Sequence, residues 1–217
     1  MNFRNWTAFI VGGSEGIGYA IADALCERQS QVVLFARNIE KLKQAQSALL
    51  KKHPQARVEV VSMDITDAVQ VENVLSPLID RFGAPDLLVN CAGVAHPGYL
   101  HSLPVEKIQE MLQVNVFGTM TVTRAILEPM KRYKRRSFIV NVSSVAGYVG
   151  LFGYTGYCAS KFAVVGFSEA LRSECYGTGI EVSVLCPPNT RTPGLARENL
   201  GKPPEILAME EKVKVLE

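Results

Sequence analysis

The chain has 217 residues, 47% of them hydrophobic, and its 23 basic side chains nearly balance its 21 acidic ones. This length and apolar content suit one compact domain over residues 1–217 with a sizeable core. A formal net charge of +2 is too small for the basic surface of a nucleic-acid-binding protein, so we expect no nucleic-acid partner.

The cysteine pattern argues against both disulfides and metal binding. The five cysteines are odd in number, scattered along the chain and free of any Cys-x-x-Cys spacing. We therefore expect free thiols, no metal site and a reducing compartment, which for this protein is the cytoplasm. No charged leader followed by an apolar segment opens the chain, and no run of about 18 apolar residues predicts a membrane span.

The first elements predict a strand, a glycine loop and a helix. Thr7–Val11 is a short apolar run typical of a strand buried on both faces, and residues 19–25 have helical apolar spacing. In this context the intervening glycines favour a tight turn whose backbone approaches a dinucleotide pyrophosphate at the helix N-terminus. Their spacing is Gly-x-x-x-Gly-x-Gly rather than Gly-x-Gly-x-x-Gly, so a plain glycine-rich turn stays an alternative. The candidate cofactor residues of the loop are Gly12, Ser14, Glu15, Gly16, Ile17 and Gly18.

The end of the second predicted strand indicates which dinucleotide would bind. The apolar run Gln31–Ala36 is followed by Arg37, 19 residues after Gly18. An acidic residue in this region would accept the ribose hydroxyls of NAD(H), whereas an arginine accommodates the 2′-phosphate of NADP(H). The sequence therefore favours NADP(H), and Ser14 and Lys41 could contact the same phosphate. An ordinary solvated arginine is the alternative.

Two further strand ends carry candidate cofactor residues. Residues 57–62 and 86–90 predict the third and fourth strands. An aspartate after the third strand suits an adenine contact, or it only caps the next helix, predicted over 68–82. An asparagine followed by small residues after the fourth strand suits close backbone approach to a cofactor, or a plain turn. The candidates at these two ends are Asp64, Ile65, Asn90, Ala92 and Gly93.

A long helical region is predicted over 104–133, and it contains Asn115 in an otherwise apolar stretch. A buried amide must find partners, so Asn115 is either a structural bridge or part of a polar site. His96 and His101 precede this region, and we interpret both as surface residues because neither has a partner at ligand or triad spacing. The basic run 131–136 is interpreted as a solvated face that complements the helix C-terminus.

Tyr157 and Lys161 predict a proton-transfer centre. They stand four residues apart in a helix predicted over 155–176, so the two side chains share one face. A lysine ammonium beside a phenol favours the phenolate, and an oxidised nicotinamide ring would add the further positive charge that a large downward pKa shift requires. One Tyr-x-x-x-Lys also arises easily by chance, so this pair alone decides little.

A serine precedes this pair at the end of another strand. Ser144 follows the strand predicted over 137–142 and could donate a hydrogen bond to a substrate carbonyl. Ser143 is the alternative if the register differs by one. A sixth strand is predicted over 181–186, and the turn-rich segment 187–194 after it can cover a bound cofactor, for which Pro187 and Thr190 are the candidates.

The alternation of strands and helices predicts an α/β fold with a doubly wound parallel sheet. With the glycine loop, residues 90–93, Asn115, Ser144 and Tyr157-x-x-x-Lys161 in this order, the chain resembles the short-chain dehydrogenase/reductase family over essentially its whole length. This resemblance implies a Rossmann-type, three-layer α/β/α fold and an NAD(P)-dependent oxidoreductase acting on alcohols and carbonyls. It implies that Tyr157 is the general acid in reduction and that Lys161 lowers the tyrosine pKa and holds the nicotinamide ribose. It further implies that Ser144 orients the carbonyl and that Asn115 holds a relay water.

Within this family the chain is similar to the 3-ketodihydrosphingosine reductases, on residues 150–154, 161–163 and 187–194. Most family members carry Pro-Gly where this chain has Pro187-Pro188. The resemblance implies an NADPH-dependent reductase that converts 3-ketosphinganine to sphinganine in sphingolipid synthesis. A 3-oxoacyl thioester or hydroxysteroid reductase would have the same catalytic residues. A different class of function is a sensor or scaffold that binds NADP(H) without turnover.

The same resemblance implies a long-chain sphingoid ketone as substrate, a homo-oligomer, and transient contact with a membrane surface. Family members continue into a further strand and helices after the point where this chain ends, so we expect that those elements are absent or not included. A lipid substrate would need an apolar cleft, whose candidate residues could equally be core or interface. These are Leu151, Phe152, Tyr154, Leu195, Leu200, Ile206 and Leu207.

Overall fold

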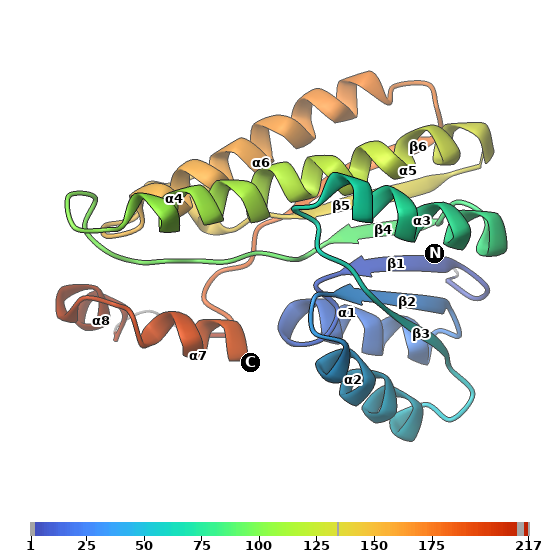
Figure 1. The fold of residues 1–217 in the computed structure, drawn as a ribbon, viewed down its shortest axis with the longest axis horizontal. Coiled ribbons are helices and arrows are strands. Elements are labelled where there is room, and N and C mark those ends of the chain that lie inside the picture. Colours follow the sequence, from blue (N-terminus) through green and yellow to red (C-terminus); the bar gives the residue numbers. More distant parts are fainter. Residues whose placement is uncertain (1–2, 134, 212–214, 217) are drawn as a thin grey trace.

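Six parallel strands form one sheet in the order β3-β2-β1-β4-β5-β6 (Figure 1). They belong to a computed structural model that describes residues 3–133, 135–211 and 215–216. The strands are β1 (Thr7–Val11), β2 (Gln31–Ala36), β3 (Arg57–Ser62), β4 (Leu87–Asn90), β5 (Ser137–Val142) and β6 (Ile180–Leu185). The strand order reverses between β1 and β4, and in open parallel sheets ligands bind outside the carboxyl ends of the strands at this point.

Helices pack on both faces of the sheet. They are α1 (Gly16–Glu27), α2 (Ile39–Lys52), α3 (Ala68–Phe82), α4 (Val105–Leu112), α5 (Thr119–Tyr133), α6 (Thr155–Glu174), α7 (Pro193–Asn199) and α8 (Pro204–Glu210). Helices α1 and α2 cover one face, whereas α3, α5 and α6 cover the other (Figure 1). This arrangement confirms the predicted three-layer, doubly wound fold. No helix among the described residues is long and apolar enough to cross a bilayer.

Alternate side chains of the central strands enter opposite cores. Phe9 and Phe35 point into the core on the side of α3 and α5, and Ile10 and Leu34 point toward α1 and α2. All four are fully buried. Burying a side chain of this size contributes roughly 1.5–3 kcal/mol, so a one-residue slip of register would be costly. These strands therefore hold the carboxyl edge of the sheet in a fixed geometry.

The helical region predicted as continuous over 104–133 is divided in the structure. Helices α4 and α5 are joined by a π-helical turn, η1 (Gln113–Gly118), which contains Asn115. Apolar periodicity cannot show such a turn, because the residues on both sides stay helical. Single π turns inside helices occur frequently at functional sites, and this one lies beside the cavity described below.

Other predicted bounds agree with the structure or shift by one or two residues. The strand predicted over 86–90 begins at Leu87, because the carboxylate of Asp86 accepts a hydrogen bond from the Thr7 amide at 2.8 Å and pairs with Arg135 at 3.0 Å. The strand predicted over 181–186 runs one residue earlier, as Ile180–Leu185, and the helix predicted over 155–176 ends at Glu174.

Candidate active site

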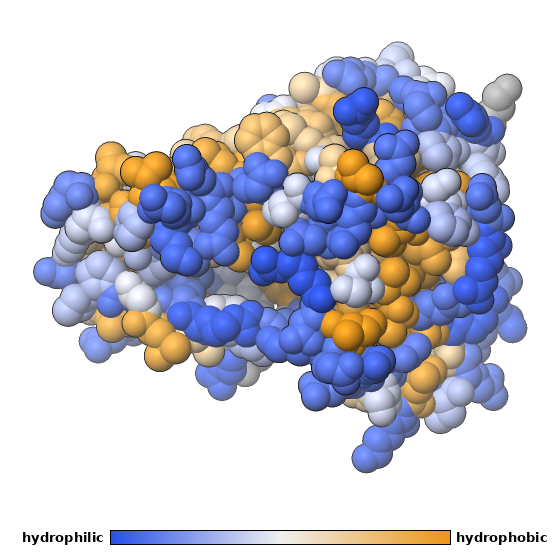
Figure 2. Space-filling view, viewed as in Figure 1, coloured by the Kyte–Doolittle hydropathy of each residue, from blue (hydrophilic) through white to orange (hydrophobic). Residues whose placement is uncertain are grey.

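A cavity of about 540 Å³ opens at the carboxyl ends of β1, β2, β4 and β5 and is bordered by α7 on its other side. Figure 2 shows the surface hollowed between α7 and α8 and the rest of the molecule. The volume lies within the range of small-molecule sites. The predicted residues that line it are Gly12, Ser14, Glu15, Gly16, Ile17, Arg37, Asp64, Ile65, Ala92, Gly93, Ser144, Tyr157, Lys161, Pro187 and Thr190.

Two glycines of the loop, Gly12 and Gly18, are packed so closely against backbone atoms that no side chain fits at either position. Gly12 has a φ of +80°, and a Cβ atom there would lie 2.6 Å from the backbone nitrogen of Ala92. A Cβ atom on Gly18 would overlap the carbonyl oxygen of Gly12. Gly18 does not line the cavity but lets α1 approach the loop. The N-cap residue Glu15 makes no side-chain capping bond, so the first amides of α1 are available to an anion.

Arg37 is exposed at the end of β2 and lines the cavity, as predicted. Lys41, predicted to share a phosphate with it, does not line the cavity and instead donates to the carboxylate of Glu15 at 2.9 Å. Glu15 also accepts a hydrogen bond from Arg197 of α7. The Arg197 hydrogen bond lowers the pKa of Glu15, and Lys41 acts in the same direction. Glu15 therefore ties the glycine loop to both α2 and α7.

Asp64 lines the cavity after β3 and closes a local turn. Its carboxylate accepts from the backbone amide of Thr66 at 2.9 Å and from the Thr66 hydroxyl at 2.7 Å. The cap of α3 is Asp67, which accepts from the amide of Gln70. The alternative that Asp64 only caps this helix is therefore wrong.

Asn90 lies at the end of β4, but its side chain is directed away from the cavity. Its amide nitrogen donates to Thr123 Oγ1 at 3.0 Å and to Asn141 Oδ1 at 2.9 Å. Asn141 in turn donates to Ser168 of α6 at 2.9 Å. This buried network holds the strand end so that Ala92 and Gly93 border the cavity, and the expected close approach of this backbone to a cofactor stays a prediction.

Asn115 is a structural bridge, the first of its two predicted alternatives. Its Oδ1 accepts from the amide of Val94 at 2.8 Å, and its Nδ2 donates to the carbonyl of Val94 at 2.9 Å and to the hydroxyl of Ser160 at 3.0 Å. The side chain does not line the cavity. It connects η1, the loop after β4 and α6, and the expected relay water stays a prediction.

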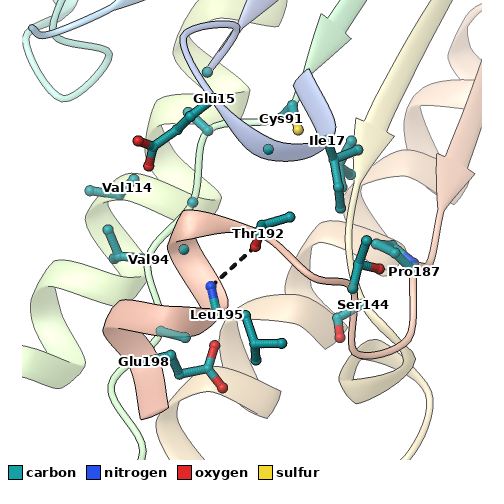
Figure 3. Close-up of a pocket in the computed structure, with 18 of the residues that line it drawn as sticks. Glu15, Ile17, Cys91, Val94, Val114, Ser144, Pro187, Thr192, Leu195 and Glu198 are labelled. Atoms are coloured by element: carbon teal, nitrogen blue, oxygen red, sulfur yellow. Dashed lines mark hydrogen bonds between the residues drawn. The ribbon is translucent and has the colours of Figure 1, made fainter. Parts of the chain in front are cut away.

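Ser144, rather than Ser143, is available at the end of β5. Ser143 is 2% exposed, and its hydroxyl donates to the backbone carbonyl of Lys161 at 3.0 Å. Ser144 is partly exposed and faces the cavity across from α7 (Figure 3). It also hydrogen-bonds to the hydroxyl of Tyr157. Both serines line the cavity, but the Ser143 hydroxyl is engaged, so the geometry favours Ser144, whose catalytic role stays a prediction.

Burial dominates the electrostatics of Tyr157 and Lys161. It raises the pKa of Tyr157 to about 12, and the hydrogen bond with Ser144 opposes this shift only in part. It lowers the pKa of Lys161 to about 8. The Lys161 nitrogen lies 5.6 Å from the centre of the Tyr157 ring. In the protein alone Ser144, and not Lys161, is the group that lowers the tyrosine pKa, and the phenol is protonated at neutral pH.

The segment predicted to cover a cofactor, 187–194, borders the cavity, and α7 and α8 extend this wall. Thr192 caps α7 by accepting from the Leu195 amide at 3.1 Å (Figure 3). Three charged residues of α7 and α8 line the cavity, and no motif in the sequence marks them. They are Arg197, Glu198 and Glu210.

The interpretation of His96 as a surface residue is wrong. His96 lines the cavity and lies 2.9 Å from a carboxylate oxygen of Glu110, so it is not a plain surface residue.

Of the residues proposed for an apolar cleft, Leu151, Tyr154 and Leu195 line the cavity. Ile206 is core, and three others are exposed outside the cavity: Phe152, Leu200 and Leu207. All five cysteines are free, and no metal-ligating cluster of three or more side chains occurs in the described part of the chain.

Sequence comparison places this site in a known family. The profile of the short chain dehydrogenase family matches residues 6–202. The chain belongs to the short-chain dehydrogenase family. Among the relatives of this short-chain dehydrogenase, the 3-ketodihydrosphingosine reductase of Bos taurus is 40% identical over 210 residues, which are 95% of this chain and 63% of that protein. The chain therefore spans less than two thirds of the length of this relative.

Solved structures of the family have the same fold as this short-chain dehydrogenase. One is a short-chain dehydrogenase/reductase from Burkholderia phymatum in complex with NAD, with a TM-score of 0.86, 27% identity, and coverage of 98% of this chain and 79% of that one. Another is an actinorhodin polyketide ketoreductase variant with NADPH, with a TM-score of 0.85, 28% identity, and coverage of 96% and 77%. The predicted family is confirmed.

Proposed function

We propose that this chain is an NADPH-dependent ketone reductase that converts 3-ketodihydrosphingosine, also named 3-ketosphinganine, to sphinganine. The observation that carries the proposal is that candidate cofactor residues and candidate catalytic residues line the same cavity. A glycine loop and Arg37 lie along one part of it, and Ser144, Tyr157 and Lys161 lie along another. The substrate follows from the likeness to the 3-ketodihydrosphingosine reductases.

The residues present fit a nicotinamide dinucleotide. The overlap that a Cβ atom would meet at Gly12 and Gly18 marks a backbone cradle, and the uncapped start of α1 offers amides to a pyrophosphate. Arg37 is exposed and lines the cavity, which supports binding of a 2′-phosphate and hence NADPH over NADH. When bound, NADPH supplies the hydride.

The chain itself supplies the proton and the charge stabilisation. Tyr157 is protonated at neutral pH and donates its phenolic proton to the developing alkoxide oxygen. General acid catalysis of this kind contributes about 10²- to 10⁴-fold in rate. Ser144 donates a hydrogen bond to the same oxygen and stabilises its negative charge. Lys161 holds the nicotinamide ribose and, when protonated, stabilises the phenolate that remains.

The test is oxidation of NADPH, followed by absorbance, with 3-ketodihydrosphingosine and a medium-chain 3-oxoacyl thioester side by side, each repeated with NADH. We expect the sphingoid ketone with NADPH to be preferred. Preference for the thioester would keep the catalytic assignment and refute the substrate. Tight NADPH binding without turnover of any ketone would instead favour a sensor or scaffold. Homo-oligomer formation and a cytoplasmic location stay predictions.

A further inference from the structure

A compact cluster of charged side chains surrounds the hydroxyl of Tyr154, which lines the cavity together with Glu198 and Glu210. Tyr154, three residues before Tyr157 on the same helix end, donates its hydroxyl to Glu198 Oε1 at 2.6 Å and to Glu210 Oε1 at 3.2 Å. The side-chain nitrogen of Lys202 lies 2.5 Å from Glu210 Oε2 and 3.4 Å from Glu198 Oε1. This cluster joins α7 and α8 to the start of α6.

The cluster carries one uncompensated negative charge. Glu198 and Glu210 are two carboxylates against the single ammonium of Lys202, whose side chain is fully buried. Burial, followed by the two carboxylates, raises the pKa of Tyr154 far above its usual value, so its phenol stays neutral. The Glu198 and Glu210 side chains are 18% and 23% exposed. A partly buried net charge is unfavourable unless something of opposite charge approaches it.

Glu198 has an oxygen available for such a partner, whereas Glu210 does not. Both oxygens of Glu210 are engaged, Oε1 by Tyr154 and Oε2 by Lys202. The polar contacts that described residues make with Glu198 all involve Oε1, so Oε2 keeps its capacity to accept. Figure 3 shows Glu198 on α7 beside Leu195, and both residues line the cavity.

Tyr154 connects Glu198 to the site of proton transfer. The ring centres of Tyr154 and Tyr157 are 5.9 Å apart, and Tyr154 is in direct contact with Glu198. A cation on the carbon next to a ketone would therefore come near Glu198 when the carbonyl oxygen meets Tyr157 and Ser144. Few ketones carry a positive charge at that position, so such a contact would discriminate between substrates.

We propose that Glu198 is a specificity-determining residue that binds a protonated amine on the carbon adjacent to the reacting carbonyl. Tyr154 and Lys202 hold its carboxylate in place, and the incoming ammonium neutralises the excess charge of the cluster. This inference rests on the proposed function, because 3-ketodihydrosphingosine is a ketone with an amine at that carbon. It extends that function by assigning the recognition of the amine to a residue outside the family's catalytic motif.

The experiment compares kcat/KM for 3-ketodihydrosphingosine and for its analogue in which hydrogen replaces the amine. A charge-assisted hydrogen bond contributes enough for about a 10- to 100-fold preference, so we expect the wild-type protein to prefer the amine by that factor. Glu198→Gln should lose the preference mainly through KM for the amino ketone. The readout is the ratio of kcat/KM for the two ketones, because the Glu198 charge also raises the pKa of Tyr157 and its removal acts on both ketones alike. Retained NADPH binding, followed by fluorescence, shows that the variant is folded.

Glu205→Gln is the matched control. Glu205 is a carboxylate on α8 that is exposed, does not line the cavity and hydrogen-bonds to Tyr99, so its variant should keep the wild-type preference. Equal kcat/KM for the two ketones with the wild-type protein would overturn the inference and leave the proposed function intact, whatever the fate of the variants. An unchanged preference in folded Glu198→Gln would also overturn it. Turnover of neither ketone would overturn the proposed function first.

Discussion

The side-chain nitrogen of Lys161 donates a hydrogen bond to the carbonyl oxygen of Val142 at 3.0 Å, where β5 ends. The lysine is 5% exposed, so its ammonium is held by the backbone in a nearly dry site. Burial is the cause that lowers its pKa from 10.5 to about 8, and the nearby thiols of Cys91 and Cys186 oppose the shift. Keeping the Lys161 ammonium charged in this site therefore lowers the free energy of unfolding.

This cost predicts a pH dependence of stability. Below about pH 8 both the folded and unfolded chains bind the proton, and the full penalty is present. Between pH 8 and 10.5 the unfolded chain holds a proton that the folded chain has lost, so stability rises with pH. From pH 7 to 9.5 this group should add on the order of 2 kcal/mol to the free energy of unfolding.

Lys161→Met tests this prediction because it keeps a long apolar stem and removes the charge. At pH 7 we expect the variant to have a higher free energy of unfolding than the wild-type protein, as measured with urea. This difference should fall by about 2 kcal/mol between pH 7 and pH 9.5. The thiols of Cys26 and Cys91 have their pKa raised to about 11 and act in the opposite direction in both proteins. The Lys161 charge lowers the Cys91 pKa, so the comparison ends at pH 9.5, below the pH at which the folded Cys91 thiol titrates. An identical pH dependence for the two proteins would contradict the assignment.

Tyr157→Phe isolates the proton donor. The variant keeps the ring that packs beside Tyr154 and loses only the hydroxyl, so cofactor binding should persist while ketone reduction falls by at least about 10²-fold. Single-turnover NADPH oxidation and a fluorescence titration measure the two quantities separately. Tyr176→Phe is the control, since that ring is 92% exposed. Appreciable turnover in Tyr157→Phe would refute the acid role.

Gly12→Ala tests whether the glycine loop is a cradle. The new Cβ would meet the backbone of Ala92 at a residue whose φ of +80° is already unfavourable for alanine. We expect a lower melting temperature and a large loss of NADPH affinity. Gly166→Ala is the matched control, because a Cβ there meets nothing within 4 Å and alanine should stabilise α6 by roughly 0.5–1 kcal/mol. Unchanged NADPH binding in Gly12→Ala would remove the loop from the cofactor site.

The sheet and the position of Ser144, Tyr157 and Lys161 at one cavity were predictable because they depend on short-range patterns. Strands such as Thr7–Val11 are buried on both faces and read as apolar runs, and the four-residue spacing of Tyr157 and Lys161 fixes a common helix face. The carboxyl ends of parallel strands meet at one edge. Residues that follow different strands, such as Arg37 and Ser144, therefore come together without any knowledge of tertiary contacts.

The remainder depends on long-range contacts that leave no local pattern. The strand end at Asn90 was expected to approach a cofactor with its backbone, but no local pattern shows that the Asn90 side chain turns to Asn141 and Thr123, because a strand's last residue can face either side. Glu198 was not singled out because α7 reaches the cavity only after the chain returns from β6. Its anchor to the glycine loop, the contact between Arg197 and Glu15, joins residues 182 apart in sequence.

The last prediction concerns the cofactor phosphate, for which Arg37 and Lys41 were both candidates. Arg37 lines the cavity, whereas the Lys41 ammonium is paired with Glu15 at 2.9 Å. Arg37→Asp should therefore raise the Kd for NADPH by at least about 10-fold, the loss of one charged hydrogen bond, and leave NADH binding nearly unchanged. Lys41→Met should have a smaller effect on NADPH. Lys43→Asp controls for charge reversal alone, since Lys43 lies on α2 outside the cavity and pairs with Glu40. Equal weakening of NADPH and NADH by Arg37→Asp would show that Arg37 supports the fold of this edge rather than the 2′-phosphate.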